Sequence, residues 1–503
     1  MHLLTILAFA FLLWRGEMPA SRPIIGNLSP ASTLVIVLFQ PILLGLAAFA
    51  ASRRARRLLT SRAVSCHRAQ RFHHRVTLLL RVALIGGFGF SVFGTSWPEW
   101  FAFESISPPL QIVGDCIVLS PYFAGAIALW LAAYPYEQTI RRMDSSGPDD
   151  SSINPPWNLA AYLDFNIRHH LLIVAVPMTL ILFAADLIRS YGATLTQWSR
   201  WRGAPDVALG VVAAGVFLVA PIMMRRIWRT APLECGPLRS RLEALCRRKG
   251  MRCRDILVWK SDGYMINAAV MGLVAPVRYV LLSDALLANM TPAQIEAVFG
   301  HETGHVRHRH IQHFLVFAFV GWLLVTALME LLGQRVSAPG SRPIGSVWTV
   351  DGIAIVATAL FWGLGFGWLS RRFERQADLF GARCVTPPAH ECLLPCSVHI
   401  DENTTLDGGD RVCATGAAVF ASALDRVASL NGIPREERSW RHSSIASRVR
   451  FLASVAGDPQ RAIRFENLVR RIKVGIWLAA VAGGLLSAWY WTDLMQRTAQ
   501  STQ

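Results

Sequence analysis

The sequence predicts a multi-span α-helical membrane protein, with eight or nine transmembrane helices and a small cytoplasmic α+β domain that a transmembrane hairpin splits in two. Three observations lead to this fold class. The chain has 503 residues, of which 53% are apolar, and its mean hydropathy is +0.36. Runs of about 20 apolar residues recur, each long enough to cross about 30 Å of hydrocarbon. Basic residues gather on one side of these runs, and polar stretches with short strand patterns separate some of them.

Eight apolar runs predict transmembrane helices. They lie near 32–51, 77–97, 110–134, 171–189, 206–224, 312–333, 350–369 and 473–491. The opening MHLLTILAFAFLLW has 14 residues and no basic stretch ahead of it. It predicts a ninth, short helix, with a signal sequence as the alternative.

The formal net charge of +17 raises the question of nucleic-acid binding, but the placement of the charges indicates membrane orientation. Eight arginines lie between Arg53 and Arg75, whereas the loop 98–109 has no lysine or arginine. By the positive-inside rule, the cytoplasmic stretches are 52–76, 135–170, 225–311 and 370–472. We therefore expect a lipid bilayer and no nucleic acid as a partner. Three lysines stand against 47 arginines, which is typical of a GC-rich genome and favours a bacterial plasma (inner) membrane.

These features divide the chain into five parts. Residues 1–224 form an N-terminal transmembrane region with five or six spans. The cytoplasmic domain consists of 225–311 and 370–472, and the transmembrane hairpin 312–369 separates its two pieces. Residues 473–503 form a C-terminal transmembrane helix and tail.

The cysteines predict no disulfide framework. Eight of the nine fall in the predicted cytoplasmic parts, where thiols stay reduced. One segment crowds four cysteines and two histidines: Cys384, Cys392, Cys396, Cys413, His390 and His399. Since no Cys-x-x-Cys pair is present, free thiols are favoured there, with a second, structural zinc site as the alternative.

The first cytoplasmic piece predicts three short strands followed by a helix. The strands are DILVWK (255–260), YMINAAVMG (264–272) and VRYVLL (277–282). Thr291 is a good N-cap, Pro292 suits the first helical position and Gln294 completes a capping box. We expect this helix to continue through GHETGHVRHRH (300–310) into the next span.

His301 and His305 lie one turn apart on that helix, so both rings point to a common spot. His-Glu-x-x-His is the arrangement that a catalytic zinc requires: two imidazoles and a third protein ligand bind the metal, and water takes the fourth position. Glu302 lies where it can take a proton from that water and pass it to a leaving amine.

The neighbouring histidines are poor competitors as ligands on a straight helix. His308 would lie about 10 Å along the axis from His301, and His310 would point away from the ligand face. We interpret His308, His310 and His313 as polar residues where the helix enters the membrane.

A third ligand is expected on a second helix. Ile311 stands where the extended metzincin motif needs a histidine, so that motif is excluded. In SRRFERQADLFGARC (370–384), Glu374 and Asp378 are four residues apart and share a helical face. One can bind the metal while the other hydrogen-bonds a ligand histidine. The spacing alone does not decide between a metal site and two carboxylates exposed at the surface.

At this point the sequence resembles the integral-membrane zinc metallopeptidases of the gluzincin type, which include the CAAX prenyl protease and the heat-shock membrane protease HtpX. The resemblance covers about 230–460. Its motifs occur in the family's order: Asn267-Ala268 on a strand, LSDALL (282–287), GHETGH, a pair of spans, RRFERQAD, and WRHSSIASRVRFL (440–452).

The resemblance implies a zincin-like metallopeptidase fold for the split domain and one Zn²⁺ per chain. It implies that His301, His305 and Glu374 are the zinc ligands and that Glu302 is the catalytic base. It also implies roles for five further residues: Asp378 as partner of a ligand histidine, Asn267 and Ala268 on the strand that pairs with substrate, and His442 and Arg448 near the oxyanion or the substrate.

The predicted function is therefore a zinc metalloendopeptidase that cuts polypeptide substrates, chiefly membrane proteins, at the cytoplasmic membrane face, in quality control or processing. One alternative is a proteolytically inactive zinc-binding scaffold or regulator. Another is a metal transporter, which would need ligands inside the spans, where the sequence offers almost none.

Overall fold

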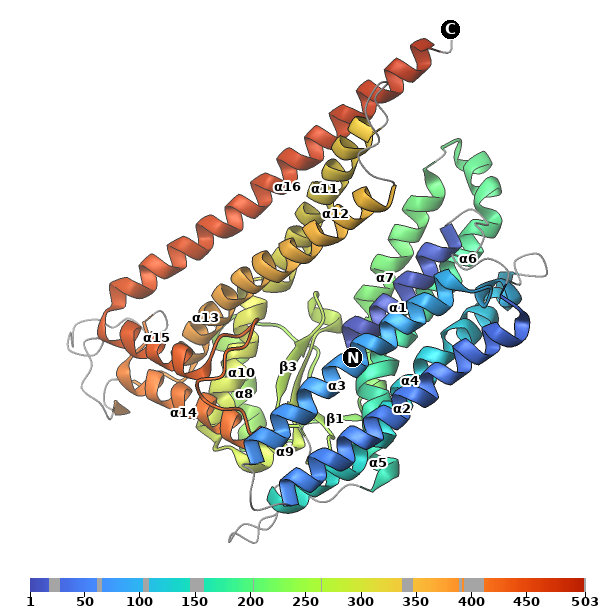
Figure 1. Cartoon of the computed structure of the whole chain (residues 1–503). Helices are drawn as coiled ribbons and strands as arrows, with labels where there is room; N and C mark the ends of the chain where they lie inside the picture. Colours follow the sequence, from blue (N-terminus) through green and yellow to red (C-terminus); the bar gives the residue numbers. More distant parts are fainter. Residues whose placement is uncertain are drawn as a thin grey trace. The chain divides into compact units, whose positions relative to one another are not determined.

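The computed structural model describes the chain (Figure 1) except for residues 18–27, 61–65, 103–107, 145–157, 202, 264, 337–346, 389–390, 393–410 and 502–503. The described part is mostly helical, with one four-stranded sheet. It separates into two compact units. The first consists of residues 1–231 and 259–264, and the second of residues 232–258 and 265–503.

Eight helices of the described residues are long and apolar enough to cross a membrane, one at each predicted position. They cover Pro30–Thr60, Arg68–Gly94, Gln111–Met143, Leu159–Ser199, Ala204–Ile227, His310–Leu332, Gly352–Cys384 and Gln460–Tyr490. The opening segment is also helical (α1, His2–Glu17), but its apolar part, His2–Leu13, is shorter than these eight. The predicted multi-span helical fold class is confirmed.

The first unit is a bundle of apolar helices. Its elements are α1, α2 (Pro30–Thr60), α3 (Cys66–Gly94), α4 (Pro108–Asp144), α5 (Leu159–Asn166), α6 (Ile173–Ser199) and α7 (Ala204–Ile227). α2, α3 and α4 pack on one another, α1 packs on α3, and α6 packs on α7. Gly45 allows the close approach of α2 to α4, because a Cβ atom there would lie 3.1 Å from the Cβ atom of Ala128.

The sheet has the order β1-β2-β4-β3. Its strands are β1 (Thr230–Pro232), β2 (Asp255–Trp259), β3 (Ala268–Met271) and β4 (Tyr279–Ser283). The three predicted strands are present with different bounds: β2 ends one residue early, β3 is about half as long as predicted, and β4 begins two residues later and ends one residue later. β1 was not predicted because its three residues carry no alternation. β4 is buried along its whole length. β3 pairs antiparallel with β4, Ala268 facing Leu282, and is the terminal strand on that side.

The helix α10 (Pro292–Arg307) begins as the sequence predicts. The Thr291 hydroxyl accepts from the backbone N–H of Gln294, and the Gln294 side chain accepts from the backbone N–H of Thr291. It ends earlier than predicted. Arg309 adopts a φ of 55°, and α11 (His310–Val336) starts as a new helix. The prediction of one continuous helix through 300–310 is therefore wrong.

The helix α13 (Gly367–Cys384) lies against α10 through small residues. A Cβ atom at Gly304 would lie 3.1 Å from the Cβ atom of Phe380 and 3.2 Å from the Cα atom of Ala377. This close approach places the polar faces of α10 and α13 opposite each other.

The other helices of this unit are α8 (Pro237–Arg248), α9 (Asp284–Asn289), α12 (Val347–Leu360), α14 (Ala414–Leu430), α15 (Ile445–Gly457) and α16 (Pro459–Ser501). α14 packs on α10, α13 and α15, and Phe299, Leu379 and Phe420 are fully buried among them. α12 and α16 both pack against α11 and run beside it (Figure 1).

Candidate metal centre

α10 and α13 bring three potential metal ligands together. His301 and His305 come from α10, and their Nε2 atoms lie 3.2 Å apart. The carboxylate oxygens of Glu374, on α13, lie 3.6 Å from Nε2 of His301 and 3.8 Å from Nε2 of His305. A tetrahedral zinc with bonds of about 2.0–2.1 Å needs ligand atoms roughly 3.3 Å apart. The donor set therefore fits one zinc ion, and among the described residues it is the cluster with metal-site spacing.

Burial sets the charge of the groups around this cluster. It raises the pKa of Glu302 to about 7, against the effect of the nearby His301. It lowers the pKa of His305 to about 3, so this imidazole is neutral and its lone pair is free for a metal. Burial also opposes protonation of His301, but the carboxylates of Asp378 and Glu374 outweigh it and raise the pKa of that ring. A metal ion must compete with a proton at His301.

Asp378 fixes the orientation of His301. Its Oδ1 atom lies 3.0 Å from Nδ1 of the imidazole, and its side chain is fully buried. An ionised carboxylate only accepts hydrogen bonds, so Nδ1 carries the proton and Nε2 offers its lone pair towards Glu374. Arg448 holds the carboxylate in turn: its Nε donates to Oδ2 at 2.8 Å, and its Nη2 donates to Oδ1.

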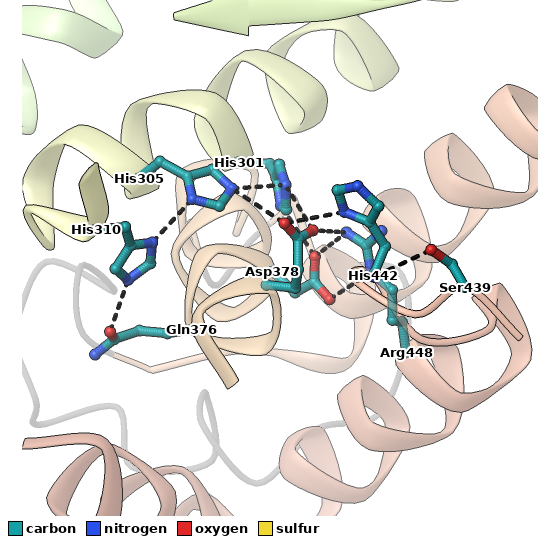
Figure 2. A network of polar contacts seen from close by, with 9 residues as sticks. His301, His305, His310, Gln376, Asp378, Ser439, His442 and Arg448 are labelled. Carbon is teal, nitrogen blue, oxygen red and sulfur yellow. Dashed lines mark hydrogen bonds and ion pairs between the residues drawn. The ribbon is translucent and has the colours of Figure 1, made fainter. Parts of the chain in front are cut away.

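A second chain of hydrogen bonds orients His305 (Figure 2). Nδ1 of His305 lies 2.9 Å from Nδ1 of His310, and Nε2 of His310 lies 3.0 Å from Oε1 of Gln376. The same oxygen accepts from Nζ of Lys473 at 2.8 Å. Since this oxygen can only accept, His310 donates through Nε2 and accepts at Nδ1. His305 therefore donates through Nδ1, and its Nε2 lone pair is left for the metal.

These hydrogen bonds correct the prediction for His310. The ring does not point away from the ligand face: it is fully buried and contacts His305 directly. The prediction assumed a straight helix, and the break at Arg309 turns His310 back towards α10 and α13. Neither Gln376 nor Lys473 was predicted as part of the site. Their sequence positions carry no signal, because the contacts depend on how α11, α13 and α16 pack.

His442 and Arg448 both lie next to Glu374, in different settings. Nδ1 of His442 lies 3.0 Å from Oε1 of Glu374, and the side chain is 48% exposed. Arg448 is buried, with Nη2 3.8 Å from Oε2 of Glu374 and a two-atom contact to Asp378. His442 is thus the half-exposed neighbour of Glu374 and Arg448 the buried one; Figure 2 shows both beside His301 and Asp378.

Asn267 and Ala268 lie at the start of the terminal strand β3. The backbone carbonyl of Asn267 accepts from the N–H of Ser283 at 3.0 Å, and its N–H donates to the Ser283 hydroxyl at 3.1 Å. β3 packs against α10, the helix that carries both histidines.

The cysteine segment lies only partly within the described residues. Cys396, His390 and His399 fall outside them. The thiol of Cys413 caps α14 by accepting from the N–H of Gly416 at 3.2 Å, and the thiol of Cys392 lies 3.2 Å from the Thr415 hydroxyl.

Part of the chain matches a known protein family. Residues 232–392 match peptidase family M48. The M48 match includes α10 and α13, and therefore His301, His305 and Glu374, and it ends before His442. The resemblance inferred from the motifs is confirmed.

Curated relatives carry the name protease HtpX. The Protease HtpX homolog of Thermoplasma acidophilum is 26% identical over 242 residues, which are 47% of this chain and 66% of the relative. The homolog of Aeropyrum pernix is 26% identical over 181 residues, 34% of this chain and 55% of the relative. Protease HtpX of Xylella fastidiosa is 32% identical over 129 residues, 24% of this chain and 44% of the relative. The chain thus matches between 44% and 66% of these relatives' length.

The fold also resembles a solved structure. The crystal structure of S. mikatae Ste24p aligns with a TM-score of 0.50 at 16% sequence identity, over 86% of this chain and 99% of that one. The likeness extends to the apolar helices outside the M48 match and supports the fold of an integral membrane protein.

Proposed function

We propose that this protein is a zinc-dependent endopeptidase of the membrane, with His301, His305 and Glu374 as the metal ligands. The observation that carries the proposal is the meeting of three donor atoms from α10 and α13 at the spacing of one tetrahedral ion. Both imidazoles present Nε2 to this point, because Nδ1 of His301 faces the carboxylate of Asp378 and Nδ1 of His305 is hydrogen-bonded to His310. The names of the HtpX relatives support the same reaction class.

Glu302 is the proposed general base. When bound, zinc supplies Lewis acidity that lowers the pKa of a water molecule to about 7 and polarises a carbonyl. Glu302 follows the ligand His301 directly in α10. Because burial raises its own pKa to about 7, it can accept a proton and later return it to the leaving amine at neutral pH.

Two further features suit a polypeptide substrate. β3 ends the sheet beside α10, so an extended peptide can add to it as a strand, starting at Asn267 and Ala268. His442 stands half-exposed beside Glu374, and we assign it a contact with the substrate carbonyl. We assign Asp378 and Arg448 to holding His301.

We further propose that the M48 domain lies on the cytoplasmic side of a bacterial inner membrane, which the positive charge near the spans supports. The eight apolar helices of the chain make membrane proteins the expected substrates, in quality control or processing.

Glu302→Gln tests the reaction. Zinc content and cleavage of an unfolded membrane polypeptide are measured for the wild type, for Glu302→Gln and for His301→Ala in the purified full-length protein. We expect Glu302→Gln to keep the metal and lose orders of magnitude in rate, and His301→Ala to lose both. Equal cleavage by the wild type and Glu302→Gln contradicts the proposal. Full rescue of a deletion phenotype by Glu302→Gln would favour the inactive scaffold.

A further inference from the structure

A basic cavity lies between α13, α15 and α16, outside the metal centre. Its volume is about 530 Å³, within the range of small-molecule sites. Four arginines line it: Arg375, Arg450, Arg461 and Arg464. They come from three helices, so the fold collects this charge from separate segments.

The cavity has more arginines than carboxylates that pair with them. Arg464 pairs with Asp458 at 2.9 Å, and Arg450 reaches Glu436 only at 3.9 Å. Both pairs are largely exposed, and such pairs are weak. Arg461 has no carboxylate within ion-pair distance among the residues that the structure describes. Four positive charges thus face two negative ones, and an anion can neutralise the excess.

Arg375 provides an anchored donor at the inner end of the cavity. Its Nη2 atom donates to the Ser447 hydroxyl at 3.2 Å, and its guanidinium lies over the ring of Phe451, 5.3 Å from the centroid. Its Nε atom is buried and has no hydrogen-bond partner within the described part of the chain. The Ser447 hydroxyl and the Phe451 ring thus hold the guanidinium of Arg375 in place as an ordered donor of the lining.

The chemistry of the lining favours phosphate. Guanidinium groups match the oxygens of phosphate through paired N–H donors, and the hydroxyl of Ser447 remains free to donate its own hydrogen. The apolar part of the lining consists of Phe451 and Phe465, whose rings meet edge to face at 4.9 Å, and Leu468. A headgroup with an attached glycerol backbone has this combination of polar and apolar surface.

The position of the cavity along α16 matches a lipid headgroup. Leu468 is five residues, or about 8 Å, before residue 473, where the last apolar span is expected to begin. Anionic headgroups of the adjacent leaflet attract basic groups at this depth.

We propose that this cavity binds a phosphate group, carried by an anionic phospholipid or free in solution. Arg375 follows Glu374 in α13, and Ser447 precedes Arg448 in α15, so the bound phosphate contacts the helix that carries one candidate ligand and the helix that carries the partner of Asp378. The proposal concerns binding only and does not depend on the proposed peptidase reaction.

The test is a displacement titration on the full-length protein in detergent. The probe is a short-chain phosphatidylglycerol with a fluorescent acyl chain, followed by anisotropy. The competitors are unlabelled phosphatidylglycerol, inorganic phosphate, zwitterionic phosphatidylcholine and a polyglutamate peptide. Arg450→Gln/Arg461→Gln removes two exposed charges from the cavity. Arg247→Gln/Arg248→Gln removes two exposed charges from the end of α8 as a matched control.

We expect saturable binding that weakens about tenfold per lost guanidinium in Arg450→Gln/Arg461→Gln and stays unchanged in the control. Displacement by phosphatidylglycerol alone identifies a lipid headgroup, and equal displacement by inorganic phosphate identifies a free anion. The proposal is overturned if binding is not saturable, if the two double variants bind alike, or if zwitterionic phosphatidylcholine or polyglutamate displaces the probe as well as phosphatidylglycerol or inorganic phosphate does.

Discussion

Replacing His310 with phenylalanine tests whether the hydrogen bonds that link Lys473, Gln376 and His310 to His305 orient that ligand for the metal. The His310 ring stacks on Phe373 with centroids 4.3 Å apart and planes 5° from parallel. Phenylalanine keeps a flat aromatic ring for that stacking and is somewhat larger than the imidazole. It removes the acceptor for Nδ1–H of His305 and the donor to Gln376.

The expected loss of zinc affinity follows from the burial of these atoms and their contact with a metal ligand. A buried donor that loses its acceptor costs about 1–3 kcal/mol. Changes to a residue that orients a metal-bound histidine typically weaken metal binding about 10–100-fold, which corresponds to about 1.4–2.8 kcal/mol. The two estimates agree. We therefore expect His310→Phe to raise the Kd for zinc by about one to two orders of magnitude.

Zinc affinity is measured by competition with a chromophoric chelator on the purified full-length protein, and the absorption spectrum of the Co²⁺-loaded form reports the ligand geometry. His313→Phe is the matched control. His313 lies one turn further along α11, and its Nδ1 contacts the carbonyl of Arg309 at 2.7 Å and no metal ligand. If both variants bind zinc equally well and give the same Co²⁺ spectrum, His310 does not orient His305.

Three other predictions follow from the same contacts. Asp378→Asn removes the buried carboxylate that Arg448 contacts through two atoms and should cost about 3–5 kcal/mol of stability, measured by denaturation in detergent. The exposed Asp458→Asn should cost at most about 1 kcal/mol; equal losses would show that the buried ion pair of Asp378 and Arg448 contributes no more than an exposed one. Gly304→Ala places a Cβ atom 3.1 Å from the Cβ atom of Phe380 on α13 and should lower the free energy of unfolding by about 1–3 kcal/mol. Gly475→Ala is the control: a Cβ atom there has nothing within 4 Å, and the variant should not lower the melting temperature. Zinc affinity should fall as the pH is lowered through the raised pKa of His301, because the metal must displace a proton from that ring. Below this pKa, the affinity should fall by up to about tenfold per pH unit. A zinc affinity that does not change between pH 8 and pH 6 would exclude this competition.

Local signals in the sequence predicted the main parts of this structure. The capping box of Thr291 and Gln294 and the eight apolar runs depend on neighbouring residues only, and the structure contains them. The spacing of Glu374 and Asp378 predicted a shared helical face, and both side chains meet His301. Spacing could not decide between a metal site and a surface pair, since that choice depends on how α13 packs.

The contacts of His305 could not be predicted because they depend on a break in the backbone. Extrapolating the helix through 300–310 turns His310 away from the ligands. A non-glycine residue with positive φ at Arg309 ends α10, and the sequence carries no glycine or proline there to indicate it. Once α11 restarts at His310, the ring reaches His305 on one side and Gln376 on the other.

α13 therefore contributes more to the centre than one ligand. Glu374 meets both histidines of α10, and Asp378 on the same face orients His301, whereas Gln376 contacts His310 of α11 and thereby orients His305. A displacement of α13 from α10 would therefore disturb the Glu374 carboxylate and the tautomers of His301 and His305 at the same time. The close glycine contacts between these helices thus set the geometry of the metal site as well as the packing of the core. It follows that Gly304→Ala should weaken zinc binding along with stability, although its side chain would touch no ligand.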